Sequence, residues 1–215
     1  DLDGDGVDDL VVGVHNYYGS AGAVVVFRGP VVGDHLDLDA DVVWDNGGEE
    51  TYNELGESVE SVGDATGDGL PDVLVGDWGG DSAWLVQGET VLRDMDLDAD
   101  AQVRFRGDTD LSNGLGRVVE DVGDLDLDGW PDVFASGGGS DPSDAYVFLG
   151  PFDVPGTRHA SMADIHLEGD EDADYYPWAA GPGDVTGDGG PDLLVCSDQY
   201  DNRHGALYIV EGTGW

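Results

Sequence analysis

The sequence contains no lysine and a single cysteine, and each scarcity excludes a class of chemistry. Schiff-base catalysis and the phosphate-binding loop of nucleotide hydrolases both require a lysine, so neither is expected. One cysteine permits no disulfide within the chain, so packing or bound metal must supply stability. We expect Cys196 to be packed inside the protein rather than to act as a nucleophile with His204.

Positive charge is equally scarce. Seven basic residues, all of them arginine, stand against 48 acidic ones, and the formal net charge is −41 over 215 residues. This charge is repelled by nucleic-acid phosphates and anionic membrane surfaces, so we expect neither nucleic-acid binding nor membrane insertion. Because 40% of the residues are hydrophobic, a folded core is expected once a cation neutralises the acidic groups.

Four aspartate-rich segments recur at a nearly fixed spacing of 63, 60 and 60 residues. They read DLDGDGVDDL from Asp1, DATGDGLPDV from Asp64, DLDLDGWPDV from Asp124 and DVTGDGGPDL from Asp184. Four short apolar runs accompany each complete period, and no window has helical periodicity. This pattern is typical of β-propeller blades. We predict an all-β propeller of four-stranded antiparallel blades, with repeats at approximately 1–55, 56–115, 116–175 and 176–215.

The first and last repeats are incomplete. The first lacks the strand expected before Asp1, and the last lacks the strand expected after Trp215. We therefore expect an open strand edge at each end, paired in a longer parent chain or by a neighbouring copy.

Each aspartate-rich segment has the pattern of a metal loop. In DxDxDGxxD, the side chains at positions 1, 3, 5 and 9 converge, glycine at position 6 permits a positive φ, and position 7 offers its carbonyl oxygen. Such hard oxygen ligands in a flexible frame favour Ca²⁺ over zinc, copper or magnesium. The predicted ligands are Asp1, Asp3, Asp5, Val7 and Asp9; Asp64, Thr66, Asp68, Leu70 and Asp72; Asp124, Asp126, Asp128, Trp130 and Asp132; and Asp184, Thr186, Asp188, Gly190 and Asp192.

The second and fourth loops have threonine at position 3, so we expect weaker sites there. An EF-hand opens with the same pattern but needs an acidic residue at position 12, where this chain has Val12, Val75, Ala135 and Val195. Acidic turns without metal are the other alternative, although a turn gains nothing from carboxylates at every second position. The segments DLDADV from Asp37 and DMDLDADA from Asp94 lack the glycine, so we expect solvated strands there.

The loops and their flanks resemble a known repeat family. LVVG or VLVG follows the first two loops, and ELGESVESVGD (54–64) or GLGRVVEDVGD (114–124) leads into the second and third. These segments are similar to the FG-GAP repeats of integrin α-subunit propellers and their bacterial relatives. The resemblance implies a seven-bladed parent ring with calcium loops on one face and ligands on the opposite face. It places the following candidates on the ligand face: His15, Tyr17, Tyr18, Trp78, Tyr175, Tyr176, Trp178 and Tyr200.

Other motifs carry less weight. Exposed aromatics often anchor partners or stack on sugars, but these aromatics equally suit packing between blades. Arg106, Gly107 and Asp108 spell RGD, yet the Gly-Asp pair recurs in LEGDED from Leu167, so we expect a solvated loop rather than an adhesive motif. The histidines have no zinc spacing, and neither HExxH nor GxSxG occurs.

We therefore expect a calcium-stabilised, non-enzymatic propeller that is secreted or surface-exposed. Its expected partner is a protein or glycan ligand, or copies of itself through the open strand edges. A structural subunit of an extracellular filament or surface layer is the first alternative, and a propeller module of a secreted hydrolase or lyase is the second. The signal segment of such a protein is expected outside this chain.

Overall fold

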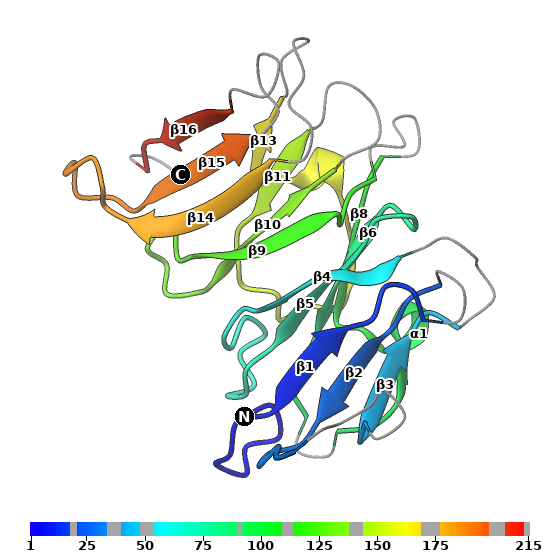
Figure 1. Cartoon of the computed structure of the whole chain (residues 1–215). Helices are drawn as coiled ribbons and strands as arrows, with labels where there is room; N and C mark the ends of the chain where they lie inside the picture. Colours follow the sequence, from blue (N-terminus) through cyan, green and yellow to red (C-terminus); the bar gives the residue numbers. More distant parts are fainter. Residues whose placement is uncertain are drawn as a thin grey trace.

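The structure is a computed structural model that describes residues 1–17, 21–33, 40–47, 54–89, 92–108, 114–137, 144–168, 177–197 and 205–212. These residues form four β-sheets, one short helix, α1 (Leu97–Asp100), and one 3-10 turn, η2 (Ala160–Met162) (Figure 1). The prediction of an all-β fold is confirmed. Within the described ranges, no helix has the length and apolar character needed to cross a bilayer.

The four sheets begin in order along the chain, but the strands Met95–Asp96 and Gly156–His159 each join the sheet before the one that the chain has already started. In the order given below, neighbouring strands of each sheet are hydrogen-bonded to one another. Sheet 1 contains β1 (Leu10–Gly13), β2 (Val24–Phe27), β3 (Val42–Asp45) and β7 (Met95–Asp96). Sheet 2 contains β4 (Leu55–Ser61), β5 (Val73–Asp77), β6 (Ser82–Val86), β8 (Val103–Arg106) and β12 (Gly156–His159). Sheet 3 contains β9 (Val118–Gly123), β10 (Asp132–Ser136), β11 (Ala145–Phe148) and β13 (Ile165–Leu167). Sheet 4 contains β14 (Trp178–Gly183), β15 (Asp192–Ser197) and β16 (Ala206–Val210).

Each aspartate-rich loop leads into a strand near one edge of its sheet. In sheets 2, 3 and 4 the loop joins two antiparallel neighbours, namely β4 to β5, β9 to β10 and β14 to β15. The strand after the loop then pairs antiparallel with the next strand along the chain, and β1 does the same with β2. The apolar runs of the sequence therefore form strands where they were expected, in the same order in each repeat.

Two strands differ from the expectation of four antiparallel strands per sheet. β7 pairs parallel with β3, and β12 pairs parallel with β8, so each adds to the outer edge of the preceding sheet. The prediction is therefore wrong for sheet 2, which has five strands, and for the antiparallel character of sheet 1. The segment from Asp94 continues from β7 directly into α1, so it is not the extended strand that was expected. These additions cover two edges that would otherwise leave backbone groups unpaired.

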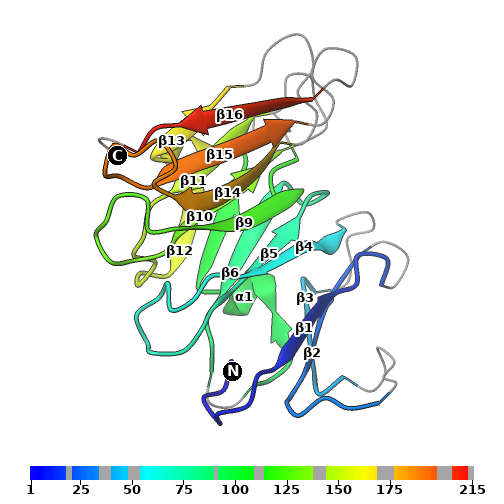
Figure 2. The same ribbon diagram turned by 60° about the vertical axis from the view of Figure 1, so that its left-hand side comes forward.

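Adjacent sheets pack face to face through apolar clusters. Trp44, Val75 and Trp84 lie between sheets 1 and 2, where all three side chains are buried. Between sheets 2 and 3, the Phe105 ring lies 4.7 Å from that of Phe148 and 5.5 Å from that of Phe152, measured between centroids. A third cluster joins sheets 3 and 4. Three successive interfaces of this kind hold the molecule together (Figure 2).

Glycine within the strand that follows a loop permits the sheets to approach closely. A Cβ atom on Gly13 would collide with the backbone of Gly56 at the start of β4. A Cβ atom on Gly76 would likewise collide with the backbone of Gly116, just before β9. Backbone therefore meets backbone at both sheet junctions, and only glycine fits these strand positions.

The outer faces of the first and last sheets are apolar but exposed. On sheet 4, Leu207 is 64% exposed and Ile209 is 51% exposed, and Leu207 pairs with Cys196 across the strands. The prediction that Cys196 is buried is wrong, because no described segment packs on this face of β15. On sheet 1, Leu10 is 45% exposed in the same manner. The first and last described strands, β1 and β16, belong to these two end sheets (Figure 1).

Candidate metal centre

All four loops are held by the same set of hydrogen bonds. The N–H at position 2 donates to the carboxylate at position 9, and the N–H at position 6 donates to the carboxylate at position 1. The N–H at position 7 donates to the carboxylate at position 5 in every loop. The aspartates therefore organise the turn in every loop. Their hydrogen bonds hold the backbone N–H groups of the position-7 residues, Val7, Leu70, Trp130 and Gly190.

The backbone turns that the loops require are present. The glycines at position 6 have φ angles of 91°, 92°, 97° and 100° in the four loops, which are unfavourable for residues with a side chain. Position 4 also has a positive φ, and there the third loop carries Leu127 at 63° instead of glycine. The sequence pattern anticipated the glycine at position 6 and missed the requirement at position 4.

The aspartate at position 9 ties each loop to the backbone just beyond the end of a neighbouring strand. Asp72 accepts the N–H groups of Ala65 and Thr66 at 2.8 Å, and its second oxygen accepts the N–H of Gly88 at 3.0 Å. In the third loop, Asp132 binds Leu125 at 2.7 Å and Gly150 at 2.9 Å in the same way. Burial raises the pKa of both Asp72 and Asp132 to about 6, so their ionised forms are costly unless a cation is near.

Carboxylate oxygens converge most closely in the first and third loops. One oxygen from each of Asp1, Asp3 and Asp9 lies within 4.8 Å of the others, and the same holds for Asp124, Asp126 and Asp128. Among the described residues these two groups alone meet that criterion. The structure thus brings together three of the four predicted carboxylates in each of these loops, leaving out Asp5 and Asp132.

The second and fourth loops differ because their threonines turn toward position 9. The Thr66 hydroxyl donates to Asp72 at 3.4 Å, and the Thr186 hydroxyl donates to Asp192 at 3.3 Å. Each threonine therefore supports the buried aspartate instead of adding a charge to the loop. Asp64, Asp68, Asp184 and Asp188 remain as carboxylates that bind backbone N–H groups of these two loops.

The donor set fits a hard divalent cation. Burial raises the pKa of Asp126, and the charges of Asp128 and Asp124 raise it further. In the first loop, Arg28 lies 3.8 Å from Asp3. Within the described ranges, no ion pair is formed by the predicted ligands of the other three loops. Oxygen-only ligands with uncompensated negative charge are those that calcium prefers.

We expect two classes of calcium affinity. Loops one and three should bind more tightly than loops two and four, because affinity rises with the number of ligand charges. Thr66→Asp should therefore tighten the second site by about tenfold, and Thr186→Asp should do the same for the fourth. Calorimetric titration measures this, with Thr157→Asp in β12 as a control that adds the same charge elsewhere. Four equal sites, or no gain in either variant, would contradict the expectation.

The candidate ligand-face residues lie at the other end of the strands. His15 and Trp78 follow the ends of β1 and β5, and Trp178 begins β14, all away from the loops. Arg117 covers the Trp78 ring at 4.5 Å from its centroid, whereas Trp178 is exposed. Tyr17 is half-buried. Tyr18, Tyr175, Tyr176 and Tyr200 lie outside the described residues.

The RGD tripeptide is not the solvated loop that was expected. Gly107 is buried, and its N–H donates to the carbonyl oxygen of Asp81 at 3.1 Å. Asp108 accepts a hydrogen bond from the Ser161 hydroxyl at 3.1 Å. Arg106 is exposed at the end of β8 and faces a pocket that the sequence did not indicate. Arg106, Gly107 and Asp108 therefore have three different environments and do not form one exposed recognition loop.

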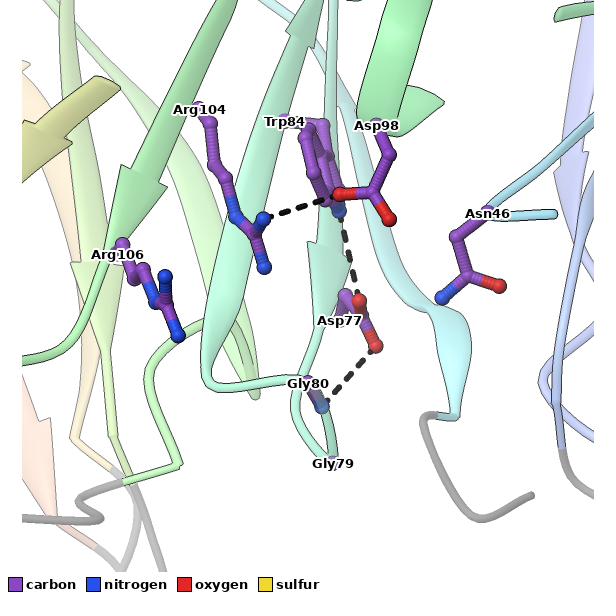
Figure 3. Close-up of a pocket in the computed structure, with 8 residues that line it drawn as sticks. All are labelled: Asn46, Asp77, Gly79, Gly80, Trp84, Asp98, Arg104 and Arg106. Carbon is purple, nitrogen blue, oxygen red and sulfur yellow. Dashed lines mark hydrogen bonds and ion pairs between the residues drawn. The ribbon is translucent and has the colours of Figure 1, made fainter. Parts of the chain in front are cut away.

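That pocket has a volume of about 340 Å³ and lies between sheets 1 and 2 (Figure 3). Its lining consists of Asn46, Asp77, Gly79, Gly80, Trp84, Asp98, Arg104 and Arg106. The buried Asp77 carboxylate accepts hydrogen bonds from Trp84 Nε1 at 3.5 Å and from the Gly80 N–H at 3.3 Å. Burial raises the pKa of Asp77 to about 6. In the sequence, only the spacing of Arg104 and Arg106, two positions apart, distinguishes this segment, and it does not indicate a pocket.

Comparison of the chain with models of protein families and with curated proteins gave no match. Function must therefore be argued from the loops, the sheets and the pocket.

Proposed function

We propose that this protein is a calcium-stabilised, non-enzymatic binding scaffold that works outside the cell or at its surface. The observation that carries the proposal is the hydrogen-bond scheme shared by the four loops, together with the convergence of carboxylates in the first and third of them. Such loops bind calcium at the concentrations found outside cells. A metal that joins two strands stabilises the fold that presents the opposite end of the sheets.

We further propose that the four sheets are consecutive blades of a propeller of the FG-GAP kind. Supporting this, the loop-leading strands lie side by side, with β4 against β9 and β9 against β14. Strands that converge in this way suit a common axis. Leu74 and Phe134, two residues after the last aspartate of their loops, are both buried against the next sheet, whereas Leu194 at the same position faces no described sheet.

The calcium part of the proposal is tested by stoichiometry. Equilibrium dialysis against calcium should give about four ions per chain, one for each loop. Each of Asp5→Ala, Asp68→Ala, Asp128→Ala and Asp188→Ala should remove one ion, because these exposed carboxylates belong to separate loops. Asp94→Ala is a control outside the loops. Binding of fewer than two ions, or equal retention of magnesium, would overturn the proposal.

A second candidate function is self-assembly as a structural subunit. The observation in its favour is the pair of apolar end faces, with Leu10 on sheet 1 and Leu207 and Ile209 on sheet 4. Exposed apolar faces of this kind mark interaction surfaces. Light scattering in calcium should show a concentration-dependent rise in mass if the chain assembles, and Leu207→Asp should abolish that rise. A constant monomer mass would leave the binding scaffold as the function.

A further inference from the structure

The side chain at position 7 of one metal loop touches the metal loop of the preceding sheet. A Cβ atom placed on Gly67, at position 4 of the second loop, would lie 2.9 Å from Cη2 of Trp130, at position 7 of the third. A Cβ atom placed on Gly4, in the first loop, would lie 3.0 Å from Cδ2 of Leu70, in the second. The same contact therefore joins loops one and two and loops two and three, and Leu70 and Trp130 are both half-buried.

The contact between Trp130 and Gly67 joins backbone that predicted ligands hold in both loops. The N–H of Gly67 donates to Asp64, the carboxylate at position 1 of the second loop, at 2.7 Å. The N–H of Trp130 donates to Asp128, the carboxylate at position 5 of the third loop, at 2.9 Å. The packing of the Trp130 ring on Gly67 therefore depends on how Asp128 holds the third loop.

A series of hydrogen bonds makes a second connection between loops two and three. Asp132, at position 9 of the third loop, accepts the N–H of Gly150 at 2.9 Å. Two residues later, the N–H of Phe152 donates to the carbonyl oxygen of Ala65 at 2.9 Å, and the Phe152 side chain is fully buried. Ala65 belongs to the second loop, where its own N–H donates to Asp72 at 2.8 Å. The buried aspartates of the two loops are therefore linked through one short backbone segment.

The fourth loop lacks the side-chain contact. Its position 7 is Gly190, which has no side chain, and position 4 of the third loop is Leu127, which is 66% exposed. No atom of the described residues lies within 4 Å of a Cβ atom placed on Gly187, at position 4 of the fourth loop. Loops two and four nevertheless have the same ligand side chains, three aspartates and one threonine, and the same bond from threonine to aspartate. The chain thus contains the same site with and without the contact.

Two effects of opposite sign act between neighbouring loops. A loop loses conformational entropy when its backbone is fixed around an ion, and it loses less when its neighbour is already fixed, so packing favours positive cooperativity. Charge opposes this, because a cation in one loop reduces the negative potential at the next. Asp68 and Asp128 are exposed, so salt at about 0.15 M screens the charge effect but not the packing. Packing should therefore decide the sign.

We propose that the first three loops bind calcium cooperatively, that Leu70 and Trp130 carry the coupling, and that the fourth loop binds without it. The inference rests on the proposed function, because it describes how the calcium sites of that scaffold act together. Fixing the backbone at position 7 of one loop also fixes the side chain that covers the glycine of the preceding loop. Coupling between two binding sites is reciprocal, so each loop strengthens the other by the same factor. The second loop should therefore bind calcium more tightly than the fourth, although their ligand side chains are the same.

The test compares loops two and four by calorimetric titration of the full chain with calcium, in salt at about 0.15 M. Asp188→Ala leaves loop two as the weak site, and Asp68→Ala leaves loop four. In the Asp188→Ala background, Trp130→Ala should raise the dissociation constant of loop two by at least about fivefold. In the Asp68→Ala background, it should change that of loop four by less than about twofold. Trp130→Ala removes no charge and keeps the carbonyl oxygen at position 7, so its effect on loop two measures packing.

A second variant perturbs the third loop without removing the tryptophan. Asp128→Ala should also raise the dissociation constant of loop two by at least about fivefold. It should change that of loop four by less than about twofold. Trp178→Ala is the matched control, because it removes an exposed tryptophan at the opposite end of the sheets, and neither loop should change by more than about twofold.

The outcomes separate this inference from the scaffold on which it rests. Equal affinities of loops two and four, or equal weakening of both by Trp130→Ala, would overturn the coupling and leave the calcium scaffold intact. Tighter binding in loop two after Asp128→Ala would also overturn the coupling, because charge would then outweigh packing. Binding of fewer than two ions by the unaltered chain would instead overturn the proposed function, and the inference with it.

Discussion

Removal of calcium with EGTA is expected to lower the melting temperature of the protein by at least about 10 °C. Each site that is saturated at 100 times its dissociation constant adds about 2.7 kcal/mol to the free energy of unfolding. In a domain of this length, about 1 kcal/mol corresponds to roughly 2–4 °C. Without the cation, the crowded carboxylates of Asp124, Asp126 and Asp128 repel one another, and the loop between β9 and β10 opens.

The measurement is a set of thermal melts in EGTA, in millimolar calcium and in millimolar magnesium. Magnesium should restore little stability, because it dehydrates reluctantly and requires a tighter octahedral shell. Limited proteolysis in EGTA should cut near Asp64 and Asp124, where two strands of one sheet meet the loop. Coincident melting curves in all three solutions would show that the fold stands without metal.

The strands could be predicted from the sequence because residues within each strand determine whether it forms. Apolar runs such as VLVG after Asp72 fill both faces of a sheet that is covered on both sides, and β5 is buried along its whole length. Glycine at position 6 and aspartate at position 9 were likewise readable, since each satisfies a requirement within its own turn. Local rules therefore determined the loops and the strand order.

The features that the sequence did not reveal depend on neighbours. β12 has no apolar alternation of its own and becomes a strand by pairing with β8 of another repeat. Cys196 occupies a position that is buried in the middle sheets and is exposed only because sheet 4 lacks a described neighbour on that side. The pocket arises where Asn46 and Arg106, 60 residues apart, meet between two sheets. The spacing of residues along the chain does not predict which residues of different sheets line the same pocket.

Asp132→Ala is expected to destabilise the protein even in EGTA, whereas Asp128→Ala should weaken only the calcium-bound form. The Asp132 side chain is fully buried and accepts two backbone hydrogen bonds, from Leu125 at 2.7 Å and Gly150 at 2.9 Å. Alanine leaves both donors without a partner, which costs about 1–3 kcal/mol for each. Asp128 is exposed, and its bond to the N–H of Trp130 can be replaced by water.

Urea unfolding in EGTA and in calcium measures this difference, and Asp132→Asn is the matched control. Asparagine keeps an oxygen that can accept one of the two hydrogen bonds, so it should lose less stability in EGTA than alanine while still losing calcium affinity. We therefore expect two separable roles for Asp132, as a support for the turn and, in the proposed calcium-bound form, as a nearby negative charge. Equal stability of Asp132→Ala and Asp128→Ala in EGTA would refute the first role, because the buried N–H groups would then have other partners. Full calcium affinity in Asp132→Asn would refute the second.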